Sequence, residues 1–497
     1  KSLAYLAPAF LWARRNNTRV VVSTNTINLQ EQMIHKDIPA ISDALGEEVR
    51  AVMVKGRANY LCLRKLNRVL ADQDRALEPA LRGAFGQVLE WAYGTDTGDR
   101  SDMDFEPDSD VWEMVSSESD MCLHAKCPHF AECFFHRARK EIEGAEILVV
   151  NHHILFADAS IRSQLGPDVE RAVLPRYRAV ILDEAHNAAD IATEYFGRMA
   201  SRIGLIRLVN AVYRREGRPS GHGGAPGGGP GQADYGALVR LRSVLYSDWA
   251  DTSRQGQIRA ALDLIDMEAA PLAIRLREVG ETFFEEVRQL ALRSAADGGE
   301  RTLRITDEIR SGQEWDGVIW PAHERLAAAL LDFAECLVRL VKTLRSEVDN
   351  MGDGENDESD GKGPGSSNSM GGGSDVYAET VELTAYANRA RGLADSLRFA
   401  VAADAPGHVY WIETAGSGPR SNVRVVAAPI AAGEAIARHL LEGQESVIFT
   451  SATLAVGESF SYIKRDVGLD LADPGRVGEL LVPSPFDFER QVLLAVC

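Results

Sequence analysis

Two adjacent carboxylates, Asp183 and Glu184, follow a short apolar run and are followed in turn by Ala185 and His186. An apolar run of four or five residues is typical of a buried strand, and ligands of doubly wound sheets bind at the carboxyl ends of such strands. There an aspartate can hold magnesium while its neighbour positions or deprotonates the attacking water. The alternative is an acidic helix N-terminus, where carboxylates interact favourably with the helix dipole. We interpret the pair as a magnesium-nucleotide site.

Cysteines form the second group with possible chemistry. Cys122, Cys127 and Cys133 lie close together in the sequence, and Cys62 precedes them. Thiolates on compact loops bind zinc or an iron–sulfur cluster, because both require four soft ligands. Paired C-x2-C knuckles, which favour zinc, are absent, so the spacing slightly favours a [4Fe–4S] cluster. The alternative is reduced cysteines that only pack, which is the role we expect for Cys336 on an apolar helical stripe.

Lys1 and Ser2 open the chain ahead of an apolar, helix-like run. In the second half of a phosphate-binding loop, a lysine reaches the β- and γ-phosphates and the next hydroxyl ligates magnesium. The glycines of such a loop do not precede this pair, and the dipeptide alone carries little information. Residues 491–497 form a strand-like run with no turn after it. We therefore expect the chain to be a fragment of a larger protein.

Strand patterns must position these residues. Residues 19–26 are followed by an amphipathic stretch, residues 27–34, which together predict a strand and helix unit. The polar tip, Ser23 to Thr26, either touches a phosphate backbone or caps the helix. Strand patterns return at residues 409–413, 422–427 and 446–450. The last leads into a second hydroxyl-rich tip, which suggests that the chain returns to the sheet that carries the acidic pair.

Composition limits the class of protein. The chain has 497 residues, 45% of them hydrophobic, which is enough for about three ordinary globular domains. It has no apolar run of membrane-spanning length and no signal peptide, so we expect a cytoplasmic protein. The formal net charge of −19 argues against binding nucleic acid by bulk charge, and any such site must be a local basic groove.

The region between residues 196 and 400 changes character. It is rich in Ala, Leu, Arg and Glu at helical spacing, which predicts a helical insertion. Two low-complexity segments, residues 215–236 and 349–375, contain Gly, Ser, Asp and Pro and cannot build a core. We expect both to be disordered loops.

The order of these motifs resembles that of the iron–sulfur helicases of superfamily 2, in particular the bacterial DinG-like branch of the XPD group. The resemblance covers nearly the whole chain. In chain order the matching segments are Lys1 with Ser2, residues 23–26 with Gln30 and Gln32, residues 55–62, the three later cysteines, residues 150–155, the DEAH box at 183–186, residues 411–413 and residues 450–454.

The resemblance implies an α/β fold: a RecA-like P-loop NTPase motor with an inserted iron–sulfur cluster domain and a helical arch domain, followed by a truncated second RecA-like domain. The implied divisions are motor parts at residues 1–54, 146–195 and 406–475, the cluster domain at 55–145, the arch at 196–405, and the start of the second motor domain at 476–497, beginning near Ser484.

The resemblance also implies roles for individual residues. Lys1 would bind the phosphates, Ser2 and Asp183 would hold Mg²⁺, and Glu184 would activate water. His186, Ser451 and Thr453 would couple nucleotide state to the grip on DNA. The implied ligands of the [4Fe–4S] cluster are Cys62, Cys122, Cys127 and Cys133, and the expected DNA contacts are Thr24, Asn25, Arg57 and Tyr60.

The implied activity is ATP-dependent translocation on single-stranded DNA from 5′ to 3′, with unwinding of forks, R-loops or damaged DNA in bacterial repair or replication. The expected partners are single-stranded and forked DNA and possible DNA–RNA hybrids, at the nucleoid and not at a membrane. Glycines of the phosphate loop and the later motifs that supply an arginine finger are missing, so we expect the fragment itself to be inactive.

Positive residues near the cysteines suggest where DNA binds. Those expected to form the local groove are Arg57, Lys65, Arg68, Lys126, Arg137, Arg139 and Lys140. Aromatic residues nearby, Tyr60, Phe130, Phe134 and Phe135, would stack on bases or pack around the cluster. Two other classes of function remain open at this point: a zinc-stabilised nucleic-acid-binding module without enzymatic activity, and a P-loop ATPase that does not act on DNA.

Overall fold

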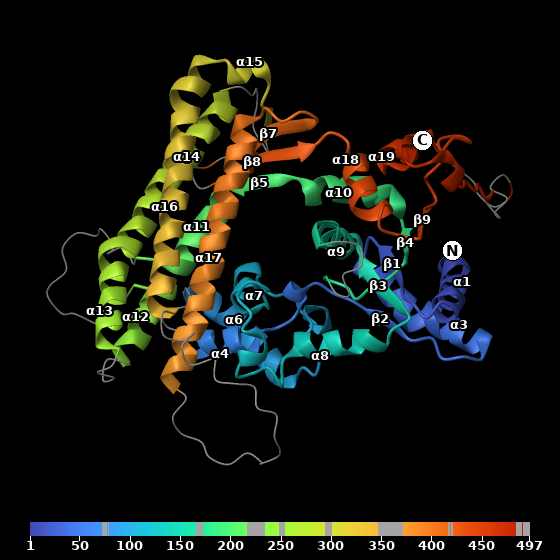
Figure 1. The fold of residues 1–497 in the computed structure, drawn as a ribbon, viewed down its shortest axis with the longest axis horizontal. Coiled ribbons are helices and arrows are strands. Elements are labelled where there is room, and N and C mark those ends of the chain that lie inside the picture. Colours follow the sequence, from blue (N-terminus) through green and yellow to red (C-terminus); the bar gives the residue numbers. More distant parts are fainter. Residues whose placement is uncertain are drawn as a thin grey trace, which may run out of the picture. The chain divides into compact units, whose positions relative to one another are not determined.

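The computed structural model describes residues 1–71, 77, 79–165, 172–215, 234–247, 254–293, 301–345, 371–415, 418, 421–483 and 490. The chain divides into two compact units, whose elements are labelled in Figure 1. Unit 1 comprises Lys1–Lys55, Ala138–Phe196 and Pro429–Cys497, and unit 2 comprises Gly56–Arg137 and Gly197–Ala428.

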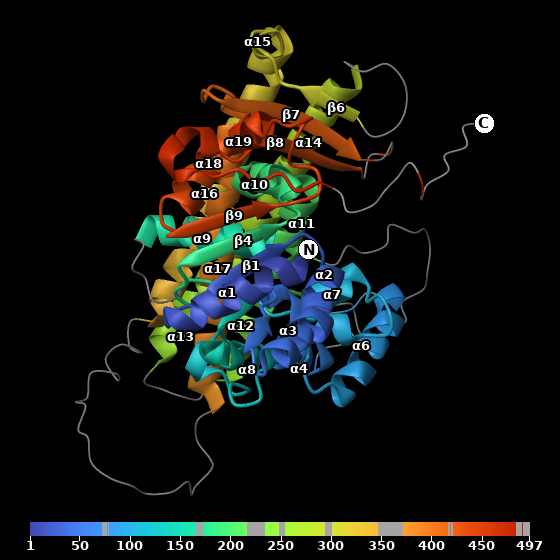
Figure 2. The same cartoon turned by 90° about the vertical axis from the view of Figure 1, so that its right-hand side faces the viewer.

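Unit 1 contains a parallel five-stranded sheet with the order β2-β3-β1-β4-β9. Figure 2 shows β1, β4 and β9 side by side. Because all neighbouring pairs are parallel, the carboxyl ends of the strands lie at one edge, with Ser23 opposite both Val150 and Leu182, and Asp183 opposite Thr450. The strands are β1 (Val20–Thr24), β2 (Ala51–Met53), β3 (Ile147–Asn151), β4 (Ala179–Asp183) and β9 (Ser446–Thr450).

Helices cover both faces of this sheet, which explains why its central strands are almost uninterrupted apolar runs. Alternate residues divide between two cores: Val20 and Val22 pack with α1 and α3, whereas Val21 packs with α9, α10 and α18. The bounds in unit 1 are α1 (Ser2–Arg15), α2 (Ile27–Gln32), α3 (Ile38–Leu45), α9 (His152–Leu165), α10 (Ala188–Phe196), α18 (Ala432–Ile436) and α19 (Ser461–Asp466). This parallel α/β arrangement is typical of a RecA-like core, as predicted.

Unit 2 is mainly helical. Its long helices α14, α16 and α17 pack around one apolar core that includes Phe283, Phe333 and Leu337. Cys336 lies in the same core and is fully buried, as predicted. The helices are α4 (Leu63–Ala71), α6 (Arg82–Gly94), α7 (Ser109–Val115), α11 (Arg202–Val212), α12 (Ala237–Ser247), α13 (Gln255–Leu264), α14 (Ala270–Arg293), α15 (Asp307–Arg310), α16 (Trp320–Arg345) and α17 (Gly371–Ala402), and α8 (Phe134–Glu141) crosses the boundary between the units.

A second sheet corrects one of the predicted boundaries. Strand β9 joins the sheet of the acidic pair, as expected, but the strands predicted at residues 409–413 and 422–427 do not. They form β7 and β8, which belong to a four-stranded sheet of unit 2 with the order β5-β8-β7-β6. Backbone pairing decided this assignment, because β5 pairs with β8 and β6 with β7 in antiparallel register. The strands are β5 (Arg198–Ser201), β6 (Arg301–Arg304), β7 (His408–Ala415) and β8 (Asn422–Pro429).

Several predictions fall wholly or partly outside the described residues. They concern most of the two low-complexity segments and the start of a second motor domain at Ser484. At the margins of the low-complexity segments, Tyr235 pairs with Arg214, and α17 already begins at Gly371, so the predicted loop boundaries were too wide there. Across the described parts of the chain, no helix combines the length and apolarity needed to cross a membrane.

Candidate functional site

The acidic pair lies at the carboxyl end of β4. The strand ends at Asp183, and Glu184 turns the backbone with φ +53°, in the left-handed region, before a 3-10 turn begins at Ala185. Residues other than glycine rarely adopt this conformation, and such strain clusters at functional sites. Lys1 Nζ lies 2.7 Å from Asp183 Oδ1 and 2.8 Å from Glu184 Oε1. Three residues predicted for the nucleotide site are therefore brought together.

The charges of Lys1 and of the two neighbouring carboxylates stabilise one another. Burial opposes the charge on Lys1, but hydrogen bonds and attraction from Asp183 and Glu184 outweigh it and raise the pKa of the ammonium group. Burial likewise opposes the charge on Glu184, but Lys1 outweighs that effect and lowers the pKa of the carboxyl group. One cation faces two carboxylates, so the group has an excess negative charge. With the hydroxyl of Ser2 at the start of α1, the donors are hard oxygens of the kind that magnesium prefers.

The residues predicted to couple nucleotide to DNA lie beside this pair. His186 Nδ1 is 2.7 Å from the hydroxyl of Ser451, and that hydroxyl donates to Glu184 Oε2 at 3.2 Å. The backbone N–H of Thr453 donates to the same hydroxyl at 3.4 Å. Since β4 and β9 are neighbours in the sheet, the segment that follows β9 reaches the acidic pair. One hydroxyl thus connects Glu184, His186 and Thr453.

The DNA contacts predicted at the tip of β1 agree only in part with the structure. Thr24 is fully buried, and its hydroxyl has no hydrogen-bond partner among the described residues. A side chain without exposed surface cannot contact a DNA backbone, so the expected role of Thr24 disagrees with the structure. Asn25 and Thr26 are exposed. Thr26 caps α2 by accepting a hydrogen bond from the N–H of Leu29 at 3.3 Å, which was the alternative interpretation of this tip.

A buried histidine next to the site lies in the segment 150–155 that was matched to the helicases, but no role was predicted for it. His152 begins α9, directly after β3, and its Nδ1 lies 2.7 Å from the hydroxyl of Ser23. Both side chains are fully buried. Burial lowers the pKa of the imidazole to about 4, so the ring is neutral near pH 7. Its sequence signal is a histidine at the end of a third apolar strand, but parallel neighbours of that strand become known only from the fold.

The four predicted cluster ligands all lie in unit 2. Cys62 precedes α4, whereas Cys122, Cys127 and Cys133 lie on the segment between α7 and α8. All four are half-buried and free of disulfides. Burial raises the pKa of the Cys127 thiol, with smaller contributions from the neighbouring Cys62 and Cys122. In the part of the chain that the structure describes, no group of three or more His, Cys, Asp or Glu side chains has metal-binding geometry. The four cysteines match the ligands of a thiolate-bound cluster in type and number, but the structure does not bring them into such a group.

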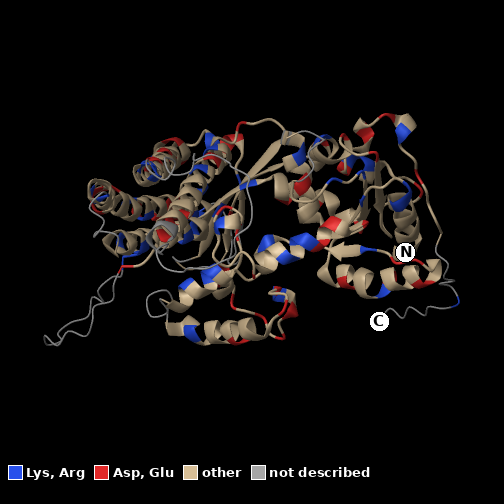
Figure 3. Ribbon diagram, turned by 60° about the horizontal axis from the view of Figure 1, so that its bottom comes forward, with Lys and Arg blue, Asp and Glu red and all other residues tan. Residues whose placement is uncertain are grey.

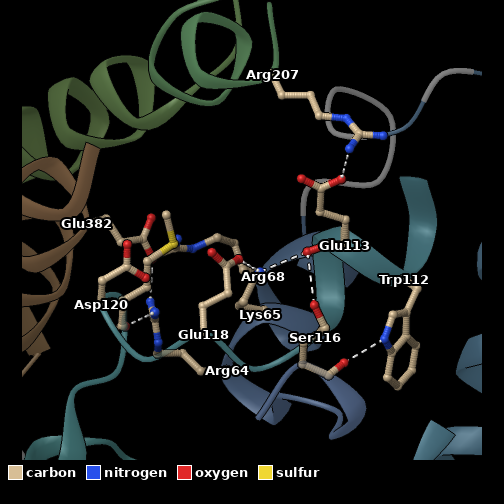
Figure 4. A network of polar contacts seen from close by, with 12 residues as sticks. Arg64, Lys65, Arg68, Trp112, Glu113, Ser116, Glu118, Asp120, Arg207 and Glu382 are labelled. Carbon is tan, nitrogen blue, oxygen red and sulfur yellow. Dashed lines mark hydrogen bonds and ion pairs between the residues drawn. The ribbon is translucent and has the colours of Figure 1, made fainter. Parts of the chain in front are cut away.

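A buried group of charges holds α4, the helix that follows the first cysteine. Arg64 donates to Glu382 at 2.7 Å, and Arg68 bonds both Glu382 and, at 2.9 Å, Glu379. Arg240 on α12 approaches Glu379 at 3.3 Å and Glu382 at 2.9 Å. Both glutamates lie on α17 and are almost fully buried. Although burial opposes ionisation, the arginines lower the pKa of Glu382 to about 2. Figure 4 shows part of this network.

Further ion pairs fix the segment that leads to the later cysteines. Lys65 donates to Glu118 at 2.5 Å and to the carbonyl oxygen of Glu113 at 2.9 Å. Arg389 on α17 bonds Glu118 and, at 2.8 Å, Asp120. Lys65, Glu113, Glu118 and Asp120 are labelled in Figure 4. Both cysteine-bearing segments are therefore tied to one helix, α17.

These contacts reduce the basic groove expected near the cysteines. Lys65 and Arg68 face carboxylates instead of solvent, and Arg57 lies over the ring of Phe135, 3.8 Å from its centroid. Tyr60 is buried and packs edge-on against the same ring, so packing, and not base stacking, describes its role in this structure. Figure 3 shows basic and acidic residues interspersed along the helices. Of the expected cations, Lys126, Arg137 and Lys140 are exposed.

Comparison with known proteins gives relatives along the whole chain, although no protein-family model matches it. The chain is 26% identical over its full length to the ATP-dependent DNA helicase YoaA of Escherichia coli and covers 61% of that protein. It is 31% identical over 59% of its length to the ATP-dependent DNA helicase YoaA of Haemophilus influenzae, of which 46% is covered. A 39% identical match to the ATP-dependent helicase DinG of Mycobacterium tuberculosis spans 39% of the chain and 30% of that protein. The chain thus spans about half the length of the YoaA relatives.

Proposed function

The chain is related to the DinG-like helicases, and we propose that the protein carrying it is an ATP-dependent DNA helicase that moves 5′ to 3′ along single-stranded DNA. Forks, R-loops and other repair or replication intermediates are the proposed substrates, with DNA–RNA hybrids among them. The names of the relatives support this activity over a non-enzymatic zinc module and over an ATPase that does not act on DNA.

The observation that carries the proposal is the meeting of Lys1, Asp183, Glu184 and Ser451 at the carboxyl edge of the parallel sheet. When ATP binds, the ammonium group of Lys1 exchanges its carboxylate partners for the β- and γ-phosphates. Bound Mg²⁺ would supply positive charge to the phosphates, with Asp183 and Ser2 as protein ligands. Glu184 then orients and deprotonates the attacking water.

The second half of the mechanism is communication with DNA. Ser451 contacts both Glu184 and His186, so a change at the γ-phosphate that moves Glu184 also changes the hydrogen bonds of Ser451. Thr453 and the exposed Asn25 would transmit that change to the DNA strand. In this proposal Ser451 reports nucleotide state, and the strand tips of β1 and β9 respond to it.

Cys62, Cys122, Cys127 and Cys133 would hold a [4Fe–4S] cluster. The cluster would cross-link the start of α4 to the segment between α7 and α8, which the ion pairs to α17 already bring together. We propose residues 56–137 as the cluster domain and the helices from α11 to α17 as the arch. Exposed Lys126 and Arg137 would contact the DNA backbone.

The test is strand displacement by the full-length protein with ATP and Mg²⁺ on three substrates: a 5′-tailed duplex, a 3′-tailed duplex and a blunt duplex. We expect unwinding of the 5′-tailed duplex, and ATP hydrolysis that single-stranded DNA stimulates. Unwinding from the 3′ tail alone would overturn the polarity, and hydrolysis without any response to DNA would favour an ATPase that acts elsewhere.

A further inference from the structure

Arg64 makes a second contact besides its ion pair with Glu382. Its Nη1 donates to Glu382 Oε1 at 2.7 Å, and its Nη2 donates to the backbone carbonyl oxygen of Met121 at 2.9 Å. Arg64 is the second residue of α4, two positions after Cys62, and Met121 directly precedes Cys122. One guanidinium group therefore joins the segments of two predicted cluster ligands to each other and to α17. Arg64 and Glu382 are both labelled in Figure 4.

The groups that meet at this contact are buried. The side chain of Arg64 is 10% exposed and that of Glu382 is 2% exposed, and Met121 packs into the helical core of unit 2. A buried guanidinium group is stable only when its charge is paired and its N–H groups are hydrogen-bonded. Because the group is planar and presents its donors in a rigid fork, it fixes the carbonyl of Met121 relative to Glu382. The residue before Cys122 is thereby held at the start of α4.

Arg68 provides a comparison within the same buried group. Its guanidinium bonds Glu382 and, at 2.9 Å, Glu379, and both of these partners lie on α17. Arg64 instead divides its contacts between α17 and the segment before Cys122. Loss of an Arg68 contact should therefore affect the packing of α4 on α17, whereas loss of the Met121 contact should also release the backbone next to a cysteine.

We propose that Arg64 is a positioning residue of the cysteine site, which holds the segments of Cys62 and Cys122 next to each other while Glu382 anchors its guanidinium group on α17. The inference deepens the proposed function and rests on its assignment of the cysteines. A cluster requires four thiolates that converge, and Cys62 is far from the other three in the sequence, so their approach depends on contacts between distant segments. Contacts that orient metal ligands typically contribute about 10- to 100-fold to metal affinity.

Lysine substitutions separate this role from helix packing. Lysine keeps a positive charge opposite Glu382, but its single ammonium group does not reproduce the fork of Arg64. We expect Arg64→Lys, in full-length protein purified anaerobically, to release iron to an excess of chelator at least about tenfold faster than wild type does. Arg68→Lys, in the same buried group, is the matched control and should release iron at nearly the wild-type rate.

The rate of iron release and the melting temperature should be measured on the same preparations. Equal rates for Arg64→Lys and Arg68→Lys would overturn the proposal. Rates that follow the melting temperature across both variants would also overturn it, because helix packing alone predicts that pattern.

Hydrogen exchange of backbone amides tests the contact whatever metal the purified protein holds. Residues 119–123 should exchange about tenfold faster in Arg64→Lys than in Arg68→Lys, because loss of a hydrogen bond from a charged donor favours local opening. Equal exchange in the two variants would overturn the proposal. If the wild-type protein holds no metal, the assignment of the cysteines in the proposed function fails instead, and the exchange comparison still decides whether Arg64 holds the two segments together.

Discussion

At the scale of single residues, one turn gives the two carboxylates of the acidic pair different burial and different contacts. Asp183 is the last residue of β4 and is nearly buried, whereas Glu184 is in the left-handed turn and remains half-exposed. Both contact Lys1, but only Glu184 also contacts Ser451. A metal ligand benefits from a fixed, buried position, and a base needs access to water and to the residues that report on DNA. The geometry therefore favours different roles for the two side chains.

Substitutions should separate these roles in the full-length protein. We expect Glu184→Gln to bind Mg-ATP normally and to lower turnover by a factor of about 100 or more, because the variant removes the base and keeps the metal ligand. Asp183→Asn should weaken the magnesium-dependent binding itself. Steady-state hydrolysis and equilibrium ATP binding, with and without Mg²⁺, measure the two effects. Wild-type turnover in both variants would remove these residues from the site.

At the scale of elements, the cysteine segments do not stand alone. Ion pairs attach α4 and the segment before Cys122 to α17, which is more than 250 residues further along the chain. Removing one partner of a buried ion pair leaves an uncompensated charge, which costs more than the pair itself contributes. Metal binding and packing of the helices are therefore expected to depend on each other.

Loss of one thiol should show which cysteines bind metal. We expect Cys127→Ser to lose iron from anaerobically purified protein and to become more sensitive to proteolysis around residues 60–137, because metal binding contributes to folding of its own ligand segment. Cys336→Ala, a substitution in the core of the helices, is the control and should keep the wild-type iron content. Iron analysis and absorbance spectra are the measurements, and zinc without iron would contradict a [4Fe–4S] cluster.

The glutamates of α17 should matter more than surface ion pairs. We expect Glu382→Gln to lower the free energy of unfolding by about 3 kcal/mol, since three arginines lose a buried counter-charge. Glu268→Gln removes the exposed partner of Arg339 and should lower stability far less, because exposed ion pairs contribute little. Urea unfolding at pH 7 compares the two, and equal effects would argue against an energetic role for the buried group.

The same group predicts a pH dependence of stability. In the folded chain the pKa of Glu382 is about 2, below its ordinary value of 4.5. Between these values the unfolded chain binds more protons, so the contribution of Glu382 is complete above pH 4.5 and declines as the pH falls toward 2. The difference in stability between wild type and Glu382→Gln should therefore shrink in this acid range.

At the scale of the whole molecule, a net charge of −19 requires that any DNA path be local. Several cations near the cysteines are already paired with carboxylates, which leaves few for phosphates. We expect binding to single-stranded DNA with a log–log salt slope of about −2, as for three phosphate contacts. Lys126→Gln with Arg137→Gln should reduce the slope by about two thirds, because two of the three contacts are lost, and Arg339→Gln is the remote control. An unchanged slope would place the path elsewhere.

The sequence by itself determined the local features of this protein. Apolar runs predicted β1, β4 and β9, helical spacing predicted the helices of unit 2, and the stripe around Cys336 predicted a core residue, because each depends on short-range periodicity. The motifs also indicated the relatives. Only the tertiary structure decided that β7 and β8 belong to a separate antiparallel sheet, that Thr24 and Tyr60 are buried, and that Lys65 and Arg68 are neutralised. These outcomes depend on partners far away in the chain, such as Glu382 for Arg68 and His152 for Ser23, and pairing at such separation leaves no periodic signal in the sequence.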